Sequence, residues 1–67
     1  MKVFYDKRFD IASIEFSKKN CIKGVEVLPG VILHIGDKSE VVILEIHDAS
    51  KHFPVNNLFK VEVDVED

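Results

Sequence analysis

The sequence has a single cysteine, Cys21, among its 67 residues. An internal disulfide is therefore excluded, and no Cys/His spacing typical of a zinc site takes its place. A chain of this length lies near the lower limit at which one hydrophobic core stabilises a fold without a disulfide, a metal or a partner. The sequence therefore predicts a single domain over residues 1–67 that gains stability by self-association, and we expect a homodimer.

Long apolar runs are also missing. No run approaches the length of a membrane span, and the N-terminal residues alternate before reaching Asp6, unlike the apolar segment of a signal peptide. A lone thiol is typical of a reducing compartment. We therefore expect a cytoplasmic protein that does not bind a membrane.

Basic and acidic side chains are unevenly distributed along the chain. Residues 1–23 carry six basic and three acidic side chains, whereas residues 24–67 carry three basic and nine acidic ones. The net charge of −3 argues against nucleic-acid binding, which favours a concentrated basic face. The two parts can attract each other within or between chains, although an ordinary solvated surface explains the same distribution.

Period-2 alternation of apolar and polar residues is abundant in the first half and predicts strands. It indicates a first hairpin from residues 2–6 and 11–16, with the Asp6 carboxylate bonding downstream backbone in the turn. Alternation resumes over residues 22–28, with Val25 and Val27 inward and Gly24 a candidate bulge.

The segment Leu28-Pro29-Gly30-Val31 matches a type II turn. Because this turn type splays strands, we expect a corner or an offset pairing there and not a tight hairpin. Residues 31–35 follow and are apolar on both faces except at His34. That pattern is typical of a central strand or of one covered by a partner.

Residues 40–47 form the next predicted strand, with Val41 and Ile43 facing away from the core as candidates for a dimer contact. Asp48 can cap a helical turn near residues 48–52. The tail is apolar at its odd positions from Phe59 and predicts a terminal edge strand, paired with the first hairpin of the same or another subunit. The predicted fold is mainly β: a single small antiparallel meander of about six short strands with one helical turn.

Three motifs, in order, resemble a small prokaryotic family known only as a domain of unknown function. The family pattern is Y-D-x-x-x-D, then E-V-x-P-G-V-I-L, then I-E-I-x-D-A-S. In this chain the corresponding residues are Tyr5-Asp6 with Asp10, Glu26–Leu33 and Leu44–Ser50. The chain departs from the pattern at His34-Ile35-Gly36 and in its tail from Val55.

The resemblance implies a compact β-rich oligomer with no assigned activity. Members are sometimes encoded beside candidate small toxins, so the resemblance also implies an antitoxin-like role by analogy. Because the tail departs from the family pattern, no role carried by the tail is transferred.

Acidic and histidine side chains are the main candidates for chemistry. Two carboxylates among Asp6, Asp10, Glu26, Glu45 and Asp48 can act as a general acid and base or bind a divalent cation. The simpler interpretation is that Asp6 and Asp48 cap turns while Glu26 and Glu45 face solvent. We prefer the simpler interpretation and predict no catalytic residues.

Metal ligation by histidine is the next alternative. The candidates are His34, His47 and His52, with Asp48 between them. His47 and His52 do not have a recognised zinc spacing, and His34 and His47 need not share an end of the sheet. We therefore predict no metal site and no cofactor.

Cys21 follows a basic loop, but no base or oxyanion site accompanies it. The three glycines are isolated, so no phosphate-binding loop is present. The sequence therefore favours a non-catalytic protein-interaction module over an enzyme. The alternative is a small metal-binding protein or hydrolase-like enzyme with a site at a subunit interface.

Overall fold

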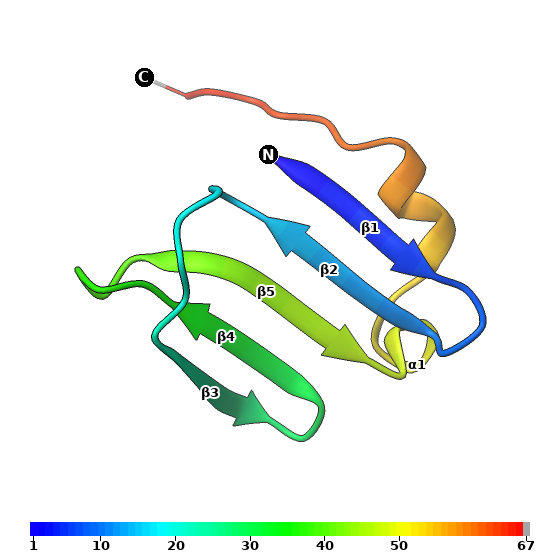
Figure 1. Ribbon diagram of the computed structural model, residues 1–67. Coiled ribbons are helices and arrows are strands. Elements are labelled where there is room, and N and C mark those ends of the chain that lie inside the picture. The colour runs from blue at the N-terminus through cyan, green and yellow to red at the C-terminus, as the bar shows by residue number, and fades with distance from the viewer. Residues whose placement is uncertain (67) are drawn as a thin grey trace.

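The computed structural model describes residues 1–66 and shows a five-stranded antiparallel sheet followed by two short helices (Figure 1). The strands are β1 (Lys2–Asp6), β2 (Ile11–Glu15), β3 (Lys23–Leu28), β4 (Val31–Ile35) and β5 (Val41–His47). The helices are α1 (Ala49–His52) and the 3-10 helix η1 (Val55–Phe59). The predicted mainly β, antiparallel fold is confirmed. No helix within residues 1–66 has the length and apolarity needed to cross a membrane.

The strand order β1-β2-β5-β4-β3 departs from a simple meander. β1 and β2 form the predicted hairpin, and β3, β4 and β5 form a three-stranded meander. The loop over residues 16–22 carries the chain across the sheet so that β5 returns beside β2. β1 and β3 are consequently the two edges, and β4 is a central strand as predicted.

The Pro29-Gly30 turn joins β3 and β4 directly, so the prediction of a corner was wrong. Gly30 has the positive φ of 78° that a type II turn requires. The expected offset in the pairing of the two strands is nevertheless present beside the turn. Glu26 pairs with Ile32 and Leu28 with Val31, which leaves Val27 as one extra residue on β3. The bulge lies at Val27 and not at the predicted Gly24, and it relaxes the mismatch between the turn and the strand twist.

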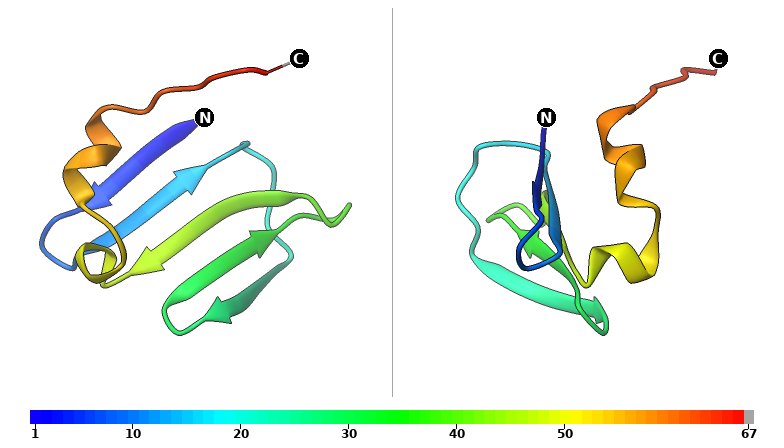
Figure 2. Two further views of the ribbon diagram at one scale, coloured as in Figure 1. Left: turned by 180° about the vertical axis from the view of Figure 1, so that it is seen from behind. Right: turned by 90° about the vertical axis from the view of Figure 1, so that its right-hand side faces the viewer.

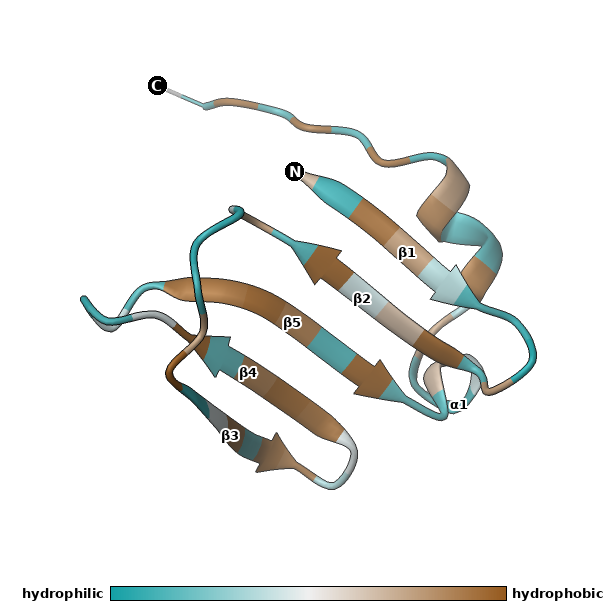
Figure 3. Ribbon diagram, in the orientation of Figure 1, coloured by the Kyte–Doolittle hydropathy of each residue, from teal (hydrophilic) through white to brown (hydrophobic). Residues whose placement is uncertain are grey.

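Strand register assigns the side chains to two faces of the sheet. We call one the aliphatic face, and away from the bulges its central residues are Ala12, Ile14, Val25, Val31, Leu33, Leu44 and Ile46. We call the other the histidine face, with Ile11, Ser13, Ile32, His34, Ile43, Glu45 and His47 at its centre. Apolar residues dominate β4 and β5 in the middle of the sheet (Figure 3).

The buried core is very small. Ala12, Val42 and Ala49 are the buried apolar residues within residues 1–66, whereas Val25 and Leu28 on β3 are 41% and 61% exposed. The side view shows a thin molecule, with α1 and η1 on one side of the sheet and the 16–22 loop on the other (Figure 2). Its extents are 35 × 32 × 19 Å. The sheet is therefore a single layer that its own helices cover only in part.

The tail does not form the predicted edge strand. Residues 55–59 form η1, and residues 61–66 are extended without pairing to any strand. In Figure 1 the tail runs beside β1, but the side view in Figure 2 places it away from the plane of the sheet. The chain already lies off the plane of the sheet at α1 and η1, so the tail that follows does not reach the edge of its own sheet.

Candidate functional site

A cluster of three polar side chains lies on the histidine face. Glu45 of β5 bonds both histidines: its Oε1 lies 2.7 Å from Nε2 of His34 on β4, and its Oε2 lies 2.5 Å from Nε2 of His47 on β5. We call this arrangement the His–Glu–His cluster. It is the most concentrated group of titratable side chains near the centre of the sheet.

Strand periodicity and register create the cluster. Glu45 and His47 are two residues apart on one strand and therefore share a face. Because Ile32 pairs with Glu45, His34 lies diagonally across from it, within reach of a long side chain. A Cβ at Gly24 would lie 3.8 Å from His34 Nδ1, so the imidazole ring lies close to the glycine on β3. The register places His34 and His47 toward opposite ends of the β4–β5 pair, as expected, and Glu45 between them joins the two through its two oxygens.

The electrostatics of the cluster favour an ionised carboxylate. The hydrogen bond from His34, and then the one from His47, hold the pKa of Glu45 below its ordinary value against the opposing effect of burial. The side chain of Glu45 is 27% exposed and those of His34 and His47 are 29% and 40% exposed. Solvent therefore reaches all three groups.

The cluster is closed by its own hydrogen bonds. Both Nε2 atoms face the carboxylate, so neither is directed at an open coordination position. Within the part of the chain that the structure describes, no group of three or more His, Cys, Asp or Glu is arranged to hold a metal ion. Asp48 and His52, the other two candidate ligands, are exposed and lie outside the cluster.

A second network joins two distant segments, the first hairpin and α1, through the carboxylate of Asp10. Its Oδ1 accepts from the Tyr5 hydroxyl at 2.6 Å, and its Oδ2 accepts from the Ser50 hydroxyl at 2.6 Å. The Ser50 amide also donates to Oδ1 at 3.1 Å, and the Ala49 amide donates to the Asp10 carbonyl at 2.9 Å. We call this network the Asp10 latch, because it ties the first hairpin to α1.

The Asp10 latch replaces the predicted helix cap. Asp48 precedes α1 with a left-handed φ of 51° and makes no side-chain capping bond, so the prediction that it caps the turn was wrong. Asp10 supplies the acceptor instead, 40 residues away from Ser50. The hydrogen bond from the Ser50 hydroxyl lowers the pKa of Asp10 most, and the one from the Tyr5 hydroxyl adds to the effect. The bond between Tyr5 and Asp10 in turn raises the pKa of Tyr5.

The other acidic candidates have local roles. Asp6 accepts from the amides of Arg8 and Phe9 at 3.0 and 3.2 Å, as predicted for the turn. Glu26 is exposed on the edge strand β3. The five acidic candidates therefore do not converge. Glu45 does not simply face solvent, because it bonds His34 and His47. The sequence did not predict these bonds, because the partners of Glu45 depend on the register between strands. The spacing of the Y-D-x-x-x-D and D-A-S motifs was the available signal for the Asp10 latch.

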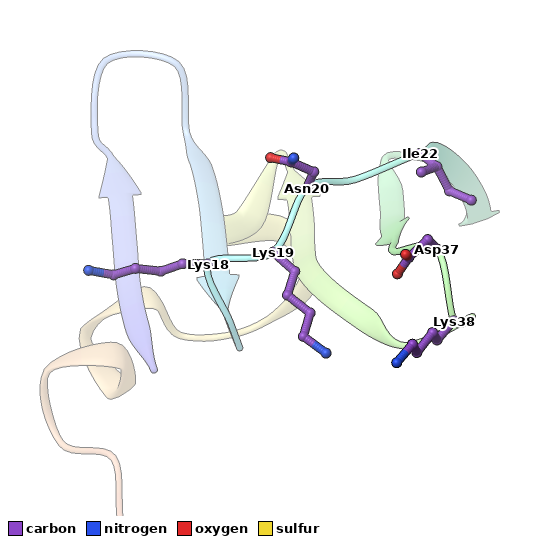
Figure 4. Close-up of a pocket in the computed structure, with 6 residues that line it drawn as sticks. All are labelled: Lys18, Lys19, Asn20, Ile22, Asp37 and Lys38. Carbon is purple, nitrogen blue, oxygen red and sulfur yellow. The ribbon is translucent and has the colours of Figure 1, made fainter.

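The loops within residues 1–66 contain no other cluster of side chains positioned to bind a ligand. Cys21 is a free, exposed thiol. An open hollow lies nearby, lined by Lys18, Lys19, Asn20, Ile22, Asp37 and Lys38 (Figure 4). Lys18 points away from the other side chains, and Lys19 bonds Glu40 at 3.2 Å. These side chains do not converge on a common point, so the hollow lacks the geometry of a binding site.

Comparison with known proteins identifies one relationship. A family model described as a protein of unknown function (DUF2283) matches residues 2–50. This match spans the five strands and the first residues of α1, including both the His–Glu–His cluster and the Asp10 latch. No curated protein and no solved structure matches the chain.

Proposed function

We propose that this chain, which belongs to the family described as a protein of unknown function (DUF2283), is a small self-associating interaction module. In this role it is non-catalytic. The observation that carries this proposal is the very small buried core of residues 1–66, limited to Ala12, Val42 and Ala49 among apolar residues. A sheet of this size gains most of its stability by burying one complete apolar face. Partial cover by its own helices favours a partner on that face.

A second copy of the chain is the partner that we propose. The aliphatic face extends to β3, where Val25 and Leu28 are 41% and 61% exposed. Interfaces of obligate homodimers resemble a domain core cut in half, and this face has that character. Val41, 40% exposed at one end of β5, adds to the apolar surface, while Ile43 is half-buried on the histidine face.

The biological task that we propose is binding of another protein, with antitoxin-like neutralisation as its most concrete form. Two properties support it: the similarity of the motifs to the family described above, and an acidic chain that suits a basic partner. The exposed free thiol of Cys21 supports a cytoplasmic location.

A second candidate function follows from the His–Glu–His cluster. In this alternative, a small metal-binding protein or hydrolase-like enzyme uses His34, Glu45 and His47 at a subunit interface. Binding there requires the two imidazoles to release the carboxylate. A metal ion that binds the folded chain selectively raises its melting temperature. An increase with Zn²⁺ or Mn²⁺ that is lost in His34→Ala would favour this alternative.

Two neighbouring substitutions on β3 test the proposed self-association. Val25 belongs to the aliphatic face and Glu26 to the other, and both are exposed on the edge strand. We expect Val25→Lys to convert a dimer to a folded monomer in sedimentation velocity, because it places a charge in the apolar interface. Glu26→Lys is the matched control and should remain dimeric. Equal masses for the two variants would contradict an interface on the aliphatic face.

A further inference from the structure

We infer that residues 61–66 form an exchanged strand, which pairs with the free edge of β1 in a second copy of the chain. This inference rests on the self-association proposed above and names the segment that crosses between copies. We call residues 61–66 the tail strand. Four properties of the described residues support the exchange: the side-chain pattern of the tail, the free edge of β1, the charges on both, and the path of the chain.

The tail strand has the residue pattern of a half-buried strand without its burial. Val61, Val63 and Val65 alternate with acidic residues, and the valines are 54%, 76% and 84% exposed. β-branched residues at every second position are typical of strands that pack one face. Within residues 1–66 the segment is extended but pairs with no strand of its own chain. Its apolar side is therefore available to another surface.

β1 provides a matching edge. It pairs with β2 on one side only, so the backbone groups directed to its other side lack strand partners. β1 has five residues and the tail strand six, so one can cover the other along its full length. Val3 lies on the aliphatic face and is half-buried, so a valine of an added strand can extend that face.

Charge favours β1 over the other edge of the sheet. The tail strand carries Glu62, Asp64 and Glu66, whereas β1 and the first turn residues after it, residues 2–8, carry Lys2, Lys7 and Arg8 against Asp6. Opposite charges on neighbouring strands stabilise pairing, and like charges oppose it. β1 and β3 each carry one basic and one acidic residue, so the advantage of β1 comes from Lys7 and Arg8 in the turn beside it. The Val27 bulge also interrupts the β3 edge, which makes β3 the poorer partner.

The path of the chain favours a second copy over the tail's own β1. In the projection of Figure 1 the tail runs in the direction opposite to β1. The side view in Figure 2 shows that α1, η1 and the tail all lie off the plane of the sheet, so the tail is not beside its own β1. Exchange of one identical element between two copies is a low-cost route to a dimer, because each contact replaces one that a single chain would make with itself.

Cysteine cross-linking of the full chain tests the exchange. Cys21→Ser removes the native thiol, and Val3→Cys with Val63→Cys places one thiol on β1 and one at the centre of the tail strand. A short bismaleimide tolerates a shift of register by one residue pair. The matched control replaces Val63→Cys by Glu26→Cys, which places the second thiol on the opposite edge of the sheet and on the face away from the proposed interface. Products are separated by denaturing electrophoresis after light scattering has established the mass in solution.

We expect a covalent dimer for the Val3–Val63 pair and at least several-fold less for the Val3–Glu26 control. A cross-link confined to one chain would overturn the exchange, since the tail would then close on its own β1. A dimeric mass with no cross-link to the tail would also overturn it, while leaving self-association through another surface intact. A monomeric mass for the unmodified chain at all concentrations would overturn both proposals.

Discussion

Asp10 joins segments of the chain that are far apart in sequence. Its left-handed φ of 55° turns the carboxylate back toward α1, and an aspartate adopts this conformation more readily than most residues. One side chain thereby accepts from Tyr5 and Ser50 and holds the turn of the hairpin. Tyr5, Asp10 and Ser50 belong to the motifs that resemble the family, so at the residue scale these motifs have a structural explanation.

Substitutions in the Asp10 latch should destabilise the protein in a defined order. Asp10→Ala removes every acceptor for Tyr5 and Ser50 and places alanine at a positive φ, so it should lower the melting temperature most. Tyr5→Phe removes one donor, and Ser50→Ala leaves the amide bond in place, so each should have a smaller effect. Thermal unfolding followed by circular dichroism gives the order. An Asp10→Ala variant that melts no lower than Ser50→Ala would contradict the latch.

Acid should destabilise the protein through the carboxylates whose pKa the fold lowers, which are Asp10, Glu40 and Glu45. A carboxyl group with a lower pKa in the folded state contributes its full stability above the ordinary pKa of about 4. That contribution is lost as the pH falls through the ordinary value and then through the folded value. The free energy of unfolding should therefore decrease as the pH is lowered below about 5.

Glu45→Gln separates the His–Glu–His cluster from other acid effects. The variant should lose about 1 kcal/mol near neutral pH, after a discount for the partial exposure of the group, and its stability should depend less on acid pH. Urea unfolding at several pH values measures both quantities. Glu26→Gln, which alters an exposed carboxylate on β3, is the control and should reproduce the original pH profile. An unchanged profile in Glu45→Gln would contradict the role assigned to the cluster.

At the scale of elements, the turn between β3 and β4 depends on Gly30. The residue has a φ of 78°, and its carbonyl accepts from the His47 amide at 2.8 Å, which fixes the turn against the end of β5. Gly24 differs, because its φ is not positive and a Cβ there would make an ordinary contact of 3.5 Å with Ile32.

The two glycines should therefore respond differently to alanine. Gly30→Ala should cost about 1 kcal/mol or more, because alanine is strained at a positive φ. Gly24→Ala should be neutral or slightly stabilising, since it removes backbone freedom from the unfolded chain. Equilibrium denaturation of both variants tests this contrast, and an equal loss in the two would show that the turn conformation is not the cause.

Sequence reasoning succeeded where structure is local and failed where it depends on pairing between distant segments. Alternation located β1, β2 and β5, and the Pro29-Gly30 motif located a turn. The return of β5 to β2 was not visible, because period-2 patterns define faces and not neighbours. For the same reason the contact between His34 and Glu45 was missed. In the tail the local pattern was misleading. Its alternation predicts a strand, but the sheet of the same chain provides no partner for it.

At the scale of the whole molecule, the chain is a thin sheet with more apolar surface than it covers. The fully buried apolar residues within residues 1–66 are Ala12, Val42 and Ala49, too few to stabilise most folds of this size. The basic residues 2–8 and the acidic tail give two copies a complementary arrangement of charge. The self-association proposed above would account for both properties with one partner.

The most direct test of this claim is the mass of the unmodified protein in solution. Light scattering over a wide range of concentrations should give twice the chain mass of 7.6 kDa, with a melting temperature that rises with concentration. A mass of one chain at every concentration, with a melting temperature independent of dilution, would contradict self-association and leave the aliphatic face without the partner proposed for it.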